Sequence, residues 1–381
     1  MIKGFLGKIA FFGTSDRSVP ILESLKTNFD LTLCVTKENV LVGRRQSSKE
    51  VGVKRWAKEN RVNFVTINKS LKDEAERITE QMSYLGLKPE VSSFASKIKL
   101  SRAEIGVVAD FGFIIPQEIL DIFPKGLINV HFSLLPKYRG ASPVQFAILN
   151  RDSKTGITFQ IVEKTLDTGP IVKQIIYQLD GTETSGELYK TLFALAADRL
   201  PQVVQKYVNG NLLPKKQDES QASYTYSPSH PTATHIFKED ARINWESSVQ
   251  HIDAVVRAYN PWPIAWTTLK EMQNAKDKIT GFTQIKDPRN ASKIVKIHSA
   301  QTASATPRSD KESHGDNSPR HRESARGRDR NDNSPSLRGM PLPSSRGRRP
   351  WRSSLVIDSL QMESGKILLW EQFKNGYLTT S

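Results

Sequence analysis

The chain has 381 residues, which is long enough for two domains with cores of their own. Its hydrophobic content of 37% is low for one globular unit, and its formal net charge of +15 favours a polyanionic partner such as nucleic acid. The single cysteine, Cys34, excludes an internal disulfide and a cysteine-based zinc site, and no apolar run is long enough to span a membrane. These features predict a cytoplasmic protein.

The first part of the chain alternates short apolar strands with amphipathic helices. Strands are predicted at residues 9–12, 31–36, 62–65, 105–109 and 127–130, and helices at 18–25, 51–60 and 116–122. Helical connections between strands predict a mainly parallel sheet, and therefore a Rossmann-like α/β domain. The first turn, Gly13-Thr-Ser-Asp16, lacks the further glycines of a dinucleotide-binding fingerprint.

The segment between residues 37 and 54 is polar and basic, and we expect it to be a loop. Arg44, Arg45 and Lys49 lie within it. A basic loop is usually a solvated surface, but the same residues can hold a phosphate backbone.

Asn129 and His131 lie two residues apart at the carboxyl end of the predicted strand 127–130. On a strand both side chains leave the same face. Two hydrogen-bonding groups at such an edge are typical of an α/β active site, although an isolated Asn or His at a strand end is more often structural. A turn with Pro follows directly, formed by Ser133, Leu134, Leu135 and Pro136.

Further elements complete a first domain and introduce a second one. A helix at 142–149, a hairpin of strands 155–162 and 171–179, and a long helix at 187–208 end the domain of residues 1–208. Residues 209–236 are polar and predicted to be a linker. In residues 237–381 we expect a helix at 249–259 and short strands at 264–269, 280–285, 293–297, 355–360 and 366–369. This pattern predicts a small β-barrel-like (OB-like) domain.

Residues 299–352 interrupt that second domain. They carry 12 basic and 6 acidic side chains, hence +6 of the net charge, and almost no aliphatic residues. Such a composition cannot bury enough apolar surface to offset chain entropy, so we predict a disordered insert. Both an RNA-binding role and a tolerated surface insertion fit this composition.

The segment Asn129-Val-His-Phe-Ser-Leu-Leu-Pro-Lys-Tyr-Arg-Gly140 resembles the signature of the folate-dependent formyltransferases. Ile9 to Ser15 and Thr165 to Gly169 resemble two further segments of that family. Asp240 to Trp245 and Arg257 to Pro263 resemble the C-terminal domain of those members that act on methionyl-tRNA. For Asn260 to Trp266 we favour a rigid structural corner over an RNA-stacking surface.

The resemblance implies a role for each matching residue. Asn129 would donate a hydrogen bond to the oxyanion that forms when an amine attacks a formyl carbon. His131 would take part in proton transfer or help to hold the oxyanion, and Asp167 would orient and charge-stabilise His131 or position a proton-relay water. The turn from Ser133 to Pro136 would line the folate site. Phe132 departs from the small residue or proline of the family and should affect packing more than chemistry.

The implied reaction moves a formyl group from 10-formyltetrahydrofolate to the α-amino group of methionyl-initiator tRNA, with Arg44, Arg45 and Lys49 contacting the tRNA. Two alternatives are a formyltransferase for an amino sugar nucleotide and a non-catalytic RNA-binding protein on the same scaffold. We expect a monomer. The seven histidines show no ligand-spaced pair, so no metal site is expected.

Overall fold

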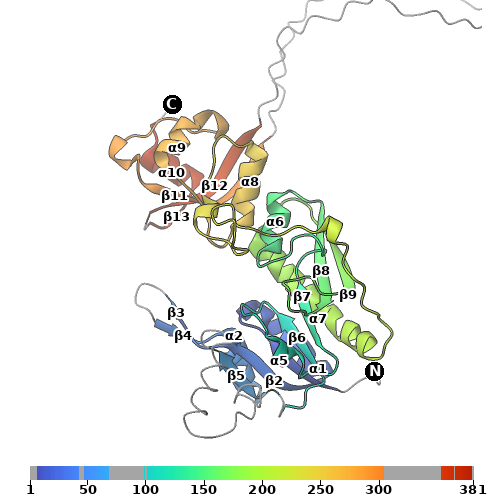
Figure 1. Ribbon diagram of the computed structural model, residues 1–381. Coiled ribbons are helices and arrows are strands. Elements are labelled where there is room, and N and C mark those ends of the chain that lie inside the picture. Colours follow the sequence, from blue (N-terminus) through green and yellow to red (C-terminus); the bar gives the residue numbers. More distant parts are fainter. Residues whose placement is uncertain are drawn as a thin grey trace, which may run out of the picture.

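The computed structural model describes residues 7–42, 47–67, 98, 101–303, 353–363 and 365–379. A seven-stranded sheet with helices packed against it forms the larger part, and a four-stranded antiparallel sheet forms the smaller part (Figure 1). Within these ranges, no helix combines the length and the apolar character that a membrane crossing requires.

The seven-stranded sheet is mainly parallel, as predicted. Its strands, in spatial order, are β5 (Phe64–Ile67), β2 (Asp30–Lys37), β1 (Lys8–Phe12), β6 (Ile105–Ala109), β7 (Leu127–His131), β8 (Lys154–Ile161) and β9 (Ile171–Gln178). The first five run parallel, and β8 is antiparallel to both of its neighbours. The carboxyl ends of β1, β6 and β7 therefore lie at one edge of the sheet, where ligands bind in open α/β folds.

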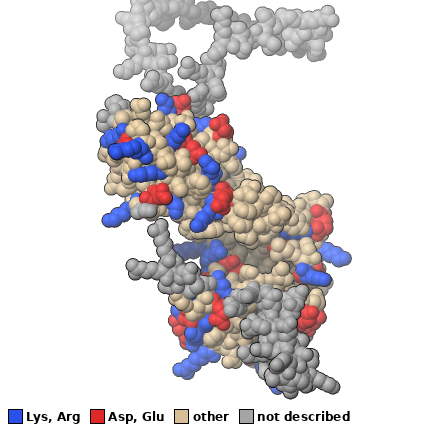
Figure 2. Space-filling view, turned by 60° about the vertical axis from the view of Figure 1, so that its left-hand side comes forward, with Lys and Arg blue, Asp and Glu red and all other residues tan. Residues whose placement is uncertain are grey.

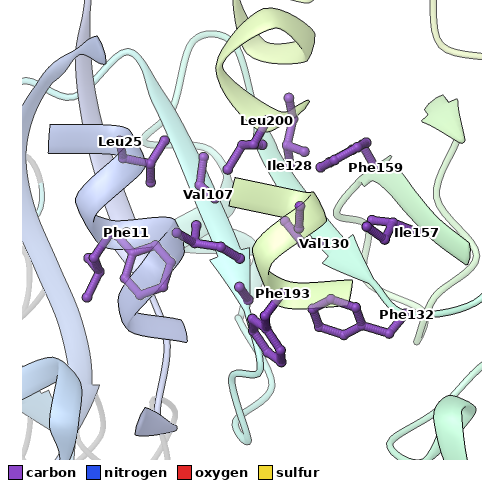
Figure 3. Close-up of a cluster of buried hydrophobic side chains, with 14 of the residues drawn as sticks. Phe11, Leu25, Val107, Ile128, Val130, Phe132, Ile157, Phe159, Phe193 and Leu200 are labelled. Atoms are coloured by element: carbon purple, nitrogen blue, oxygen red, sulfur yellow. The ribbon is translucent and has the colours of Figure 1, made fainter. Parts of the chain in front are cut away.

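Both faces of this sheet are buried. On β1, Ile9 and Phe11 belong to one apolar cluster and Ala10 and Phe12 to another, as the alternation of a strand requires. The first cluster is covered by α1 (Val19–Asn28) and α7 (Ser185–Val208), which pack against each other. Figure 3 shows this cluster, including Phe11, Val107, Val130, Phe193 and Leu200. Shorter helices complete the domain, namely α2 (Gly52–Glu59), α5 (Gln117–Leu120) and α6 (Pro143–Leu149).

Most of the basic segment between residues 37 and 54 is not the loop that was expected, because it contains the two paired strands of a β-hairpin and the first residues of α2. Strands β3 (Val40–Val42) and β4 (Ser47–Lys49) pair antiparallel, and the hairpin projects away from the larger sheet (Figure 1). Residues 43–46, which come between the two strands in the sequence, lie outside the described residues.

The smaller domain is an antiparallel sheet covered by three helices. Its strands are β10 (Ala265–Thr268), β11 (Ile294–Ala303), β12 (Ser354–Met362) and β13 (Ile367–Leu369), in that order, and its helices are α8 (Val249–Ala258), α9 (Leu269–Asn274) and α10 (Trp370–Tyr377). The small β domain is thus confirmed.

Two predictions for this domain were wrong. Residues 280–285 form no strand. Isolated bridges join Ile279, just before this segment, to Leu355 and Ile285, at its end, to Leu378. Residues 299–303 are not disordered: they continue β11 and pair with β12 until Ala303 faces Ser354. The remainder of the predicted insert, residues 304–352, lies outside the described part of the chain.

The Asn260-Pro-Trp-Pro263 segment joins the two domains. The Asn260 carbonyl accepts hydrogen bonds from Ser185 Oγ (2.7 Å) and Gly186 N (3.0 Å) at the start of α7, while Asn260 Nδ2 donates to the His298 carbonyl at 2.8 Å. These contacts support the interpretation of this segment as a structural corner.

Candidate active site

Strand β7 places Asn129 and His131 side by side on one cavity wall. Asn129 lies opposite Gln160 and His131 opposite Thr158 on β8. Asn129, His131 and Gln160 all line a cavity of about 660 Å³ at the carboxyl end of β7. The two side chains predicted to share a face therefore do so, and that face is the wall of a cavity.

The loop after β8 returns Asp167 to the same wall. Asp167 has a φ of 54°, and an added Cβ on Gly169 would lie 1.7 Å from the Ile161 carbonyl oxygen, so the loop requires glycine there. Asp167 Oδ1 is 3.3 Å from Asn129 Nδ2 and 3.6 Å from His131 Nδ1. The structure thus brings the three predicted catalytic residues together.

Fixed donors hold the Asp167 carboxylate in one orientation. The backbone N–H of Gly140 donates to Oδ2 at 2.9 Å, and Gln160 Nε2 donates to Oδ1 at 2.8 Å, in addition to the longer bond from Asn129. The Asp167 side chain is only 8% exposed, so these bonds replace most of its contacts with water.

His131 is fixed by its other nitrogen. Nε2 lies 2.9 Å from the Tyr138 carbonyl oxygen, and because a carbonyl only accepts, Nε2 carries a proton. Nδ1 therefore faces Asp167 and the cavity. The ring is 6% exposed, which leaves it little freedom to turn.

Two glutamines that sequence reasoning missed complete the site. Gln160 could have been found, because the apolar alternation of β8 sends its side chain to the face that Asn129 occupies. Gln217 Nε2 donates to the carbonyls of Asp167 and Gly169, both at 2.8 Å. Gln217 belongs to the segment predicted to be a linker, so this segment packs against the site.

Arg139, in the loop after β7, binds the segment of residues 209–236 through Gln217 and Glu219. Its guanidinium is fully buried and donates to both carboxylate oxygens of Glu219, at 2.7 and 2.8 Å, and to Gln217 Oε1 at 2.8 and 3.1 Å. The hydrogen bonds to Glu219 raise the pKa of Arg139 above its usual value. Arg139 is therefore a permanent cation neutralised inside the protein.

One wall of the cavity is apolar. It follows β6 and the loop after β8, and its side chains are Val108, Phe111, Phe113, Ile115, Val162 and Leu166. Phe132 also reaches the cavity, but its ring packs against Phe193 at 4.2 Å and Tyr189 at 6.0 Å (Figure 3). These contacts agree with the expectation that Phe132 affects packing more than chemistry, which stays a prediction.

The turn of Ser133, Leu134, Leu135 and Pro136 does not line this cavity. Ser133 is fully buried and Leu135 is 3% exposed, and Leu135 N donates to Thr158 Oγ1 at 3.1 Å. The turn supports β7 and β8 from behind, outside the lining of this cavity, and its expected contact with the folate stays a prediction.

Of the residues predicted to contact tRNA, Lys49 ends strand β4. Arg44 and Arg45 fall outside the described residues. Lys49 is exposed at the base of the hairpin, with Nζ 3.8 Å from Asp16 Oδ2. In the described part of the chain, no group of three or more His, Cys, Asp or Glu side chains could hold a metal ion.

Comparison with known proteins identifies the family. Residues 7–204 match the formyl transferase family, and residues 235–308 match the formyl transferase C-terminal domain. A methionyl-tRNA formyltransferase of Bacillus cytotoxicus is 34% identical over 263 residues, which cover 69% of this chain and 75% of that relative. One from Clostridium acetobutylicum is 31% identical over 300 residues, covering 79% and 82%.

Among solved structures, the N-formyltransferase from Helicobacter canadensis, in complex with folinic acid and dTDP-3-aminofucose, matches 76% of this chain and 95% of its own, with a TM-score of 0.47 and 20% identity. The sequence comparisons alone establish the relationship: the chain belongs to the formyl transferase family, and the two relatives named above, which match most of its length, are methionyl-tRNA formyltransferases.

Proposed function

We propose that this enzyme transfers a formyl group from 10-formyltetrahydrofolate to the α-amino group of methionyl-initiator tRNA. The observation that carries the proposal is the convergence of Asn129, His131 and Asp167 on one cavity wall in a chain of this family. The three residues come from one chain, as a monomeric enzyme requires, and we propose a monomer that acts in the cytoplasm.

The three side chains divide the chemistry. Attack of the amine on the formyl carbon places negative charge on the formyl oxygen, and Asn129 Nδ2 has a second N–H to donate to it beyond the one directed at Asp167. The nitrogen that attacks must lose a proton and the folate nitrogen must gain one. His131 Nδ1 faces the cavity for this transfer, with Asp167 stabilising the positive charge that the ring acquires.

The cavity fits the formyl donor. Its volume of about 660 Å³ lies within the usual range for small-molecule sites, and its apolar wall suits the flat rings of a folate. We place those rings against Phe111, Phe113 and Ile115, so that the formyl group is directed to Asn129.

The tRNA would approach from the side of the hairpin and the C-terminal domain. Figure 2 shows Lys and Arg side chains gathered on the upper body, which is the C-terminal domain. Lys270, Lys293 and Lys296 are exposed around β10 and β11, and Lys49 is exposed on the hairpin. Together with Arg44 and Arg45, which the sequence places between β3 and β4, these cations would bind the phosphate backbone.

Labelled formyl transfer tests the proposal, with methionyl-initiator tRNA and an amino sugar nucleotide offered in parallel. We expect incorporation into the tRNA alone and its loss in His131→Ala and Asn129→Ala. Asp152→Asn serves as a control, because this carboxylate binds Lys137 and Tyr138 outside the cavity. Incorporation into the sugar would contradict the proposed substrate, and tRNA binding without transfer by the wild type would contradict the enzymatic role.

A further inference from the structure

Two tyrosines stack on each other at the surface beside the active site. The ring centroids of Tyr224 and Tyr226 are 5.5 Å apart, with 23° between the ring planes. Their exposed fractions are 37% and 47%, unusual for large aromatic side chains that pack against each other. Exposed aromatic rings are the surfaces on which unpaired nucleobases stack.

The buried Arg139 holds the Tyr224–Tyr226 pair in place through its contacts with Tyr224. Arg139 forms a backbone bridge with Tyr224, its Nη1 donates to the Tyr224 hydroxyl at 3.2 Å, and its guanidinium carbon lies 5.7 Å from that ring centroid. The five N–H groups of Arg139 are all taken by Gln217, Glu219 and Tyr224. Arg139 therefore has no donor left for a phosphate, and its role is to hold Tyr224 in place.

The same side chains connect the tyrosines to the reacting groups. Gln217 bonds Arg139 on one side and the Asp167 carbonyl on the other. Gly140, next to Arg139, donates its N–H to the Asp167 carboxylate. Two side chains, those of Arg139 and Gln217, thus link Tyr224 to Asp167 through hydrogen bonds.

Thr225 lies between the two tyrosines and points the other way. It is fully buried, and its hydroxyl contacts the carbonyls of Arg139 and Thr234. Successive side chains of extended backbone alternate, so Tyr224 and Tyr226 share the outward face. Arg139 and Tyr226 both lie against Tyr224, whereas Tyr226 is the more exposed ring of the pair and is the one offered to a further ring.

We propose that the Tyr224–Tyr226 pair is a stacking subsite for an unpaired nucleobase at the acceptor end of the substrate tRNA. This inference rests on the proposed function. The amino group that receives the formyl group is part of an amino acid esterified to the terminal ribose. When that amino group enters the cavity beside Asp167, the terminal bases remain outside it and within reach of Tyr226.

Two variants of Tyr226 distinguish the contribution of the aromatic ring from that of an apolar side chain. Tyr226→Leu keeps an apolar side chain but removes the ring, whereas Tyr226→Phe keeps the ring. We expect Tyr226→Leu to raise the KM for methionyl-tRNA between about 5- and 150-fold, the effect of losing one base–aromatic stack. The kcat at saturating tRNA and the affinity for the folate donor should remain at wild-type values, and Tyr226→Phe should restore KM to within about twofold of wild type.

Tyr207→Leu, at the end of α7, is the matched control, and thermal unfolding of each variant establishes that it is folded. An unchanged KM in a folded Tyr226→Leu variant would overturn the subsite while leaving the proposed function intact. A KM that rises equally in Tyr226→Phe would also overturn it, since the ring would then not be the recognised feature. Failure of the wild type to formylate methionyl-tRNA would instead refute the proposed function.

Discussion

Replacing Asp167 with Asn removes the negative charge beside His131 and keeps the shape of the side chain. The carboxylate accepts one bond at Oδ2, from Gly140, and two at Oδ1, from Gln160 and Asn129. The one acceptor oxygen of Asn would face the two donors, which leaves its amide group against the Gly140 N–H. One charge-assisted hydrogen bond is lost, so we expect the free energy of unfolding to fall by about 1.5–3 kcal/mol.

The loss of activity should be larger than this loss of stability implies. A neutral side chain at 167 no longer stabilises charge on His131, so kcat should fall on the order of 10²–10⁴-fold, the usual contribution of general acid–base catalysis, with the KM for tRNA unchanged. Single-turnover formylation and urea unfolding measure the two quantities on one preparation. Asp152→Asn should lose stability but keep its kcat. A kcat of Asp167→Asn within tenfold of wild type would refute this reasoning.

Three further predictions concern stability and reactivity. Gly169→Ala should lower the melting temperature and abolish activity, since its Cβ would overlap a backbone carbonyl of β8, whereas Gly376→Ala, with open space around it, should not. Burial acts to raise the pKa of Glu271, but hydrogen bonds, led by the Thr268 N–H, outweigh it and hold the pKa at about 2. Because the pKa of Glu271 is lower in the folded than in the unfolded state, its ionised form adds up to about 3 kcal/mol to the free energy of unfolding above pH 4.5, and this stabilisation is lost as the pH falls to 2. In Glu271→Gln the free energy of unfolding should therefore fall less steeply between pH 4.5 and pH 2. Burial raises the pKa of Cys34 to about 12, so iodoacetamide at pH 8 should label it only at the rate of unfolding; rapid labelling of the native protein would contradict its burial.

The strands of the larger sheet were predictable because burial leaves a direct mark on sequence. All five residues of β6 are buried and all are apolar or glycine, so the predicted bounds Ile105–Ala109 agree with the structure. The wrong strand at 280–285 has a local cause as well. Gly281 has a φ of 72° and turns the chain, so Phe282 and Ile285 of this segment reach the core although the segment does not pair as a strand.

The site was predictable to the extent that it lies on a strand. The two-residue period places Asn129 and His131 on one face and would also have placed Gln160 on that face, where it lies opposite Asn129. The place of Asp167 in the site was predicted from the family resemblance alone, because the sequence of a turn does not determine the direction in which a carboxylate points. Gln217 left no signal, since its contacts with the Asp167 loop are made 50 residues away along the chain, by a polar segment that folds back.

Ala303 and Ser354 face each other on β11 and β12, so the chain leaves this sheet and returns to it at the same place. The entropy cost of closing a flexible connection grows only with the logarithm of its length, and a tenfold longer one costs about 2 kcal/mol more. The strand register is set by the alternation of buried and exposed residues along β11 and β12. The β11–β12 connection is therefore the position where segments can be added, exchanged or shortened in evolution, and where a reporter domain can be inserted, while the sheet and the remote active site keep their geometry.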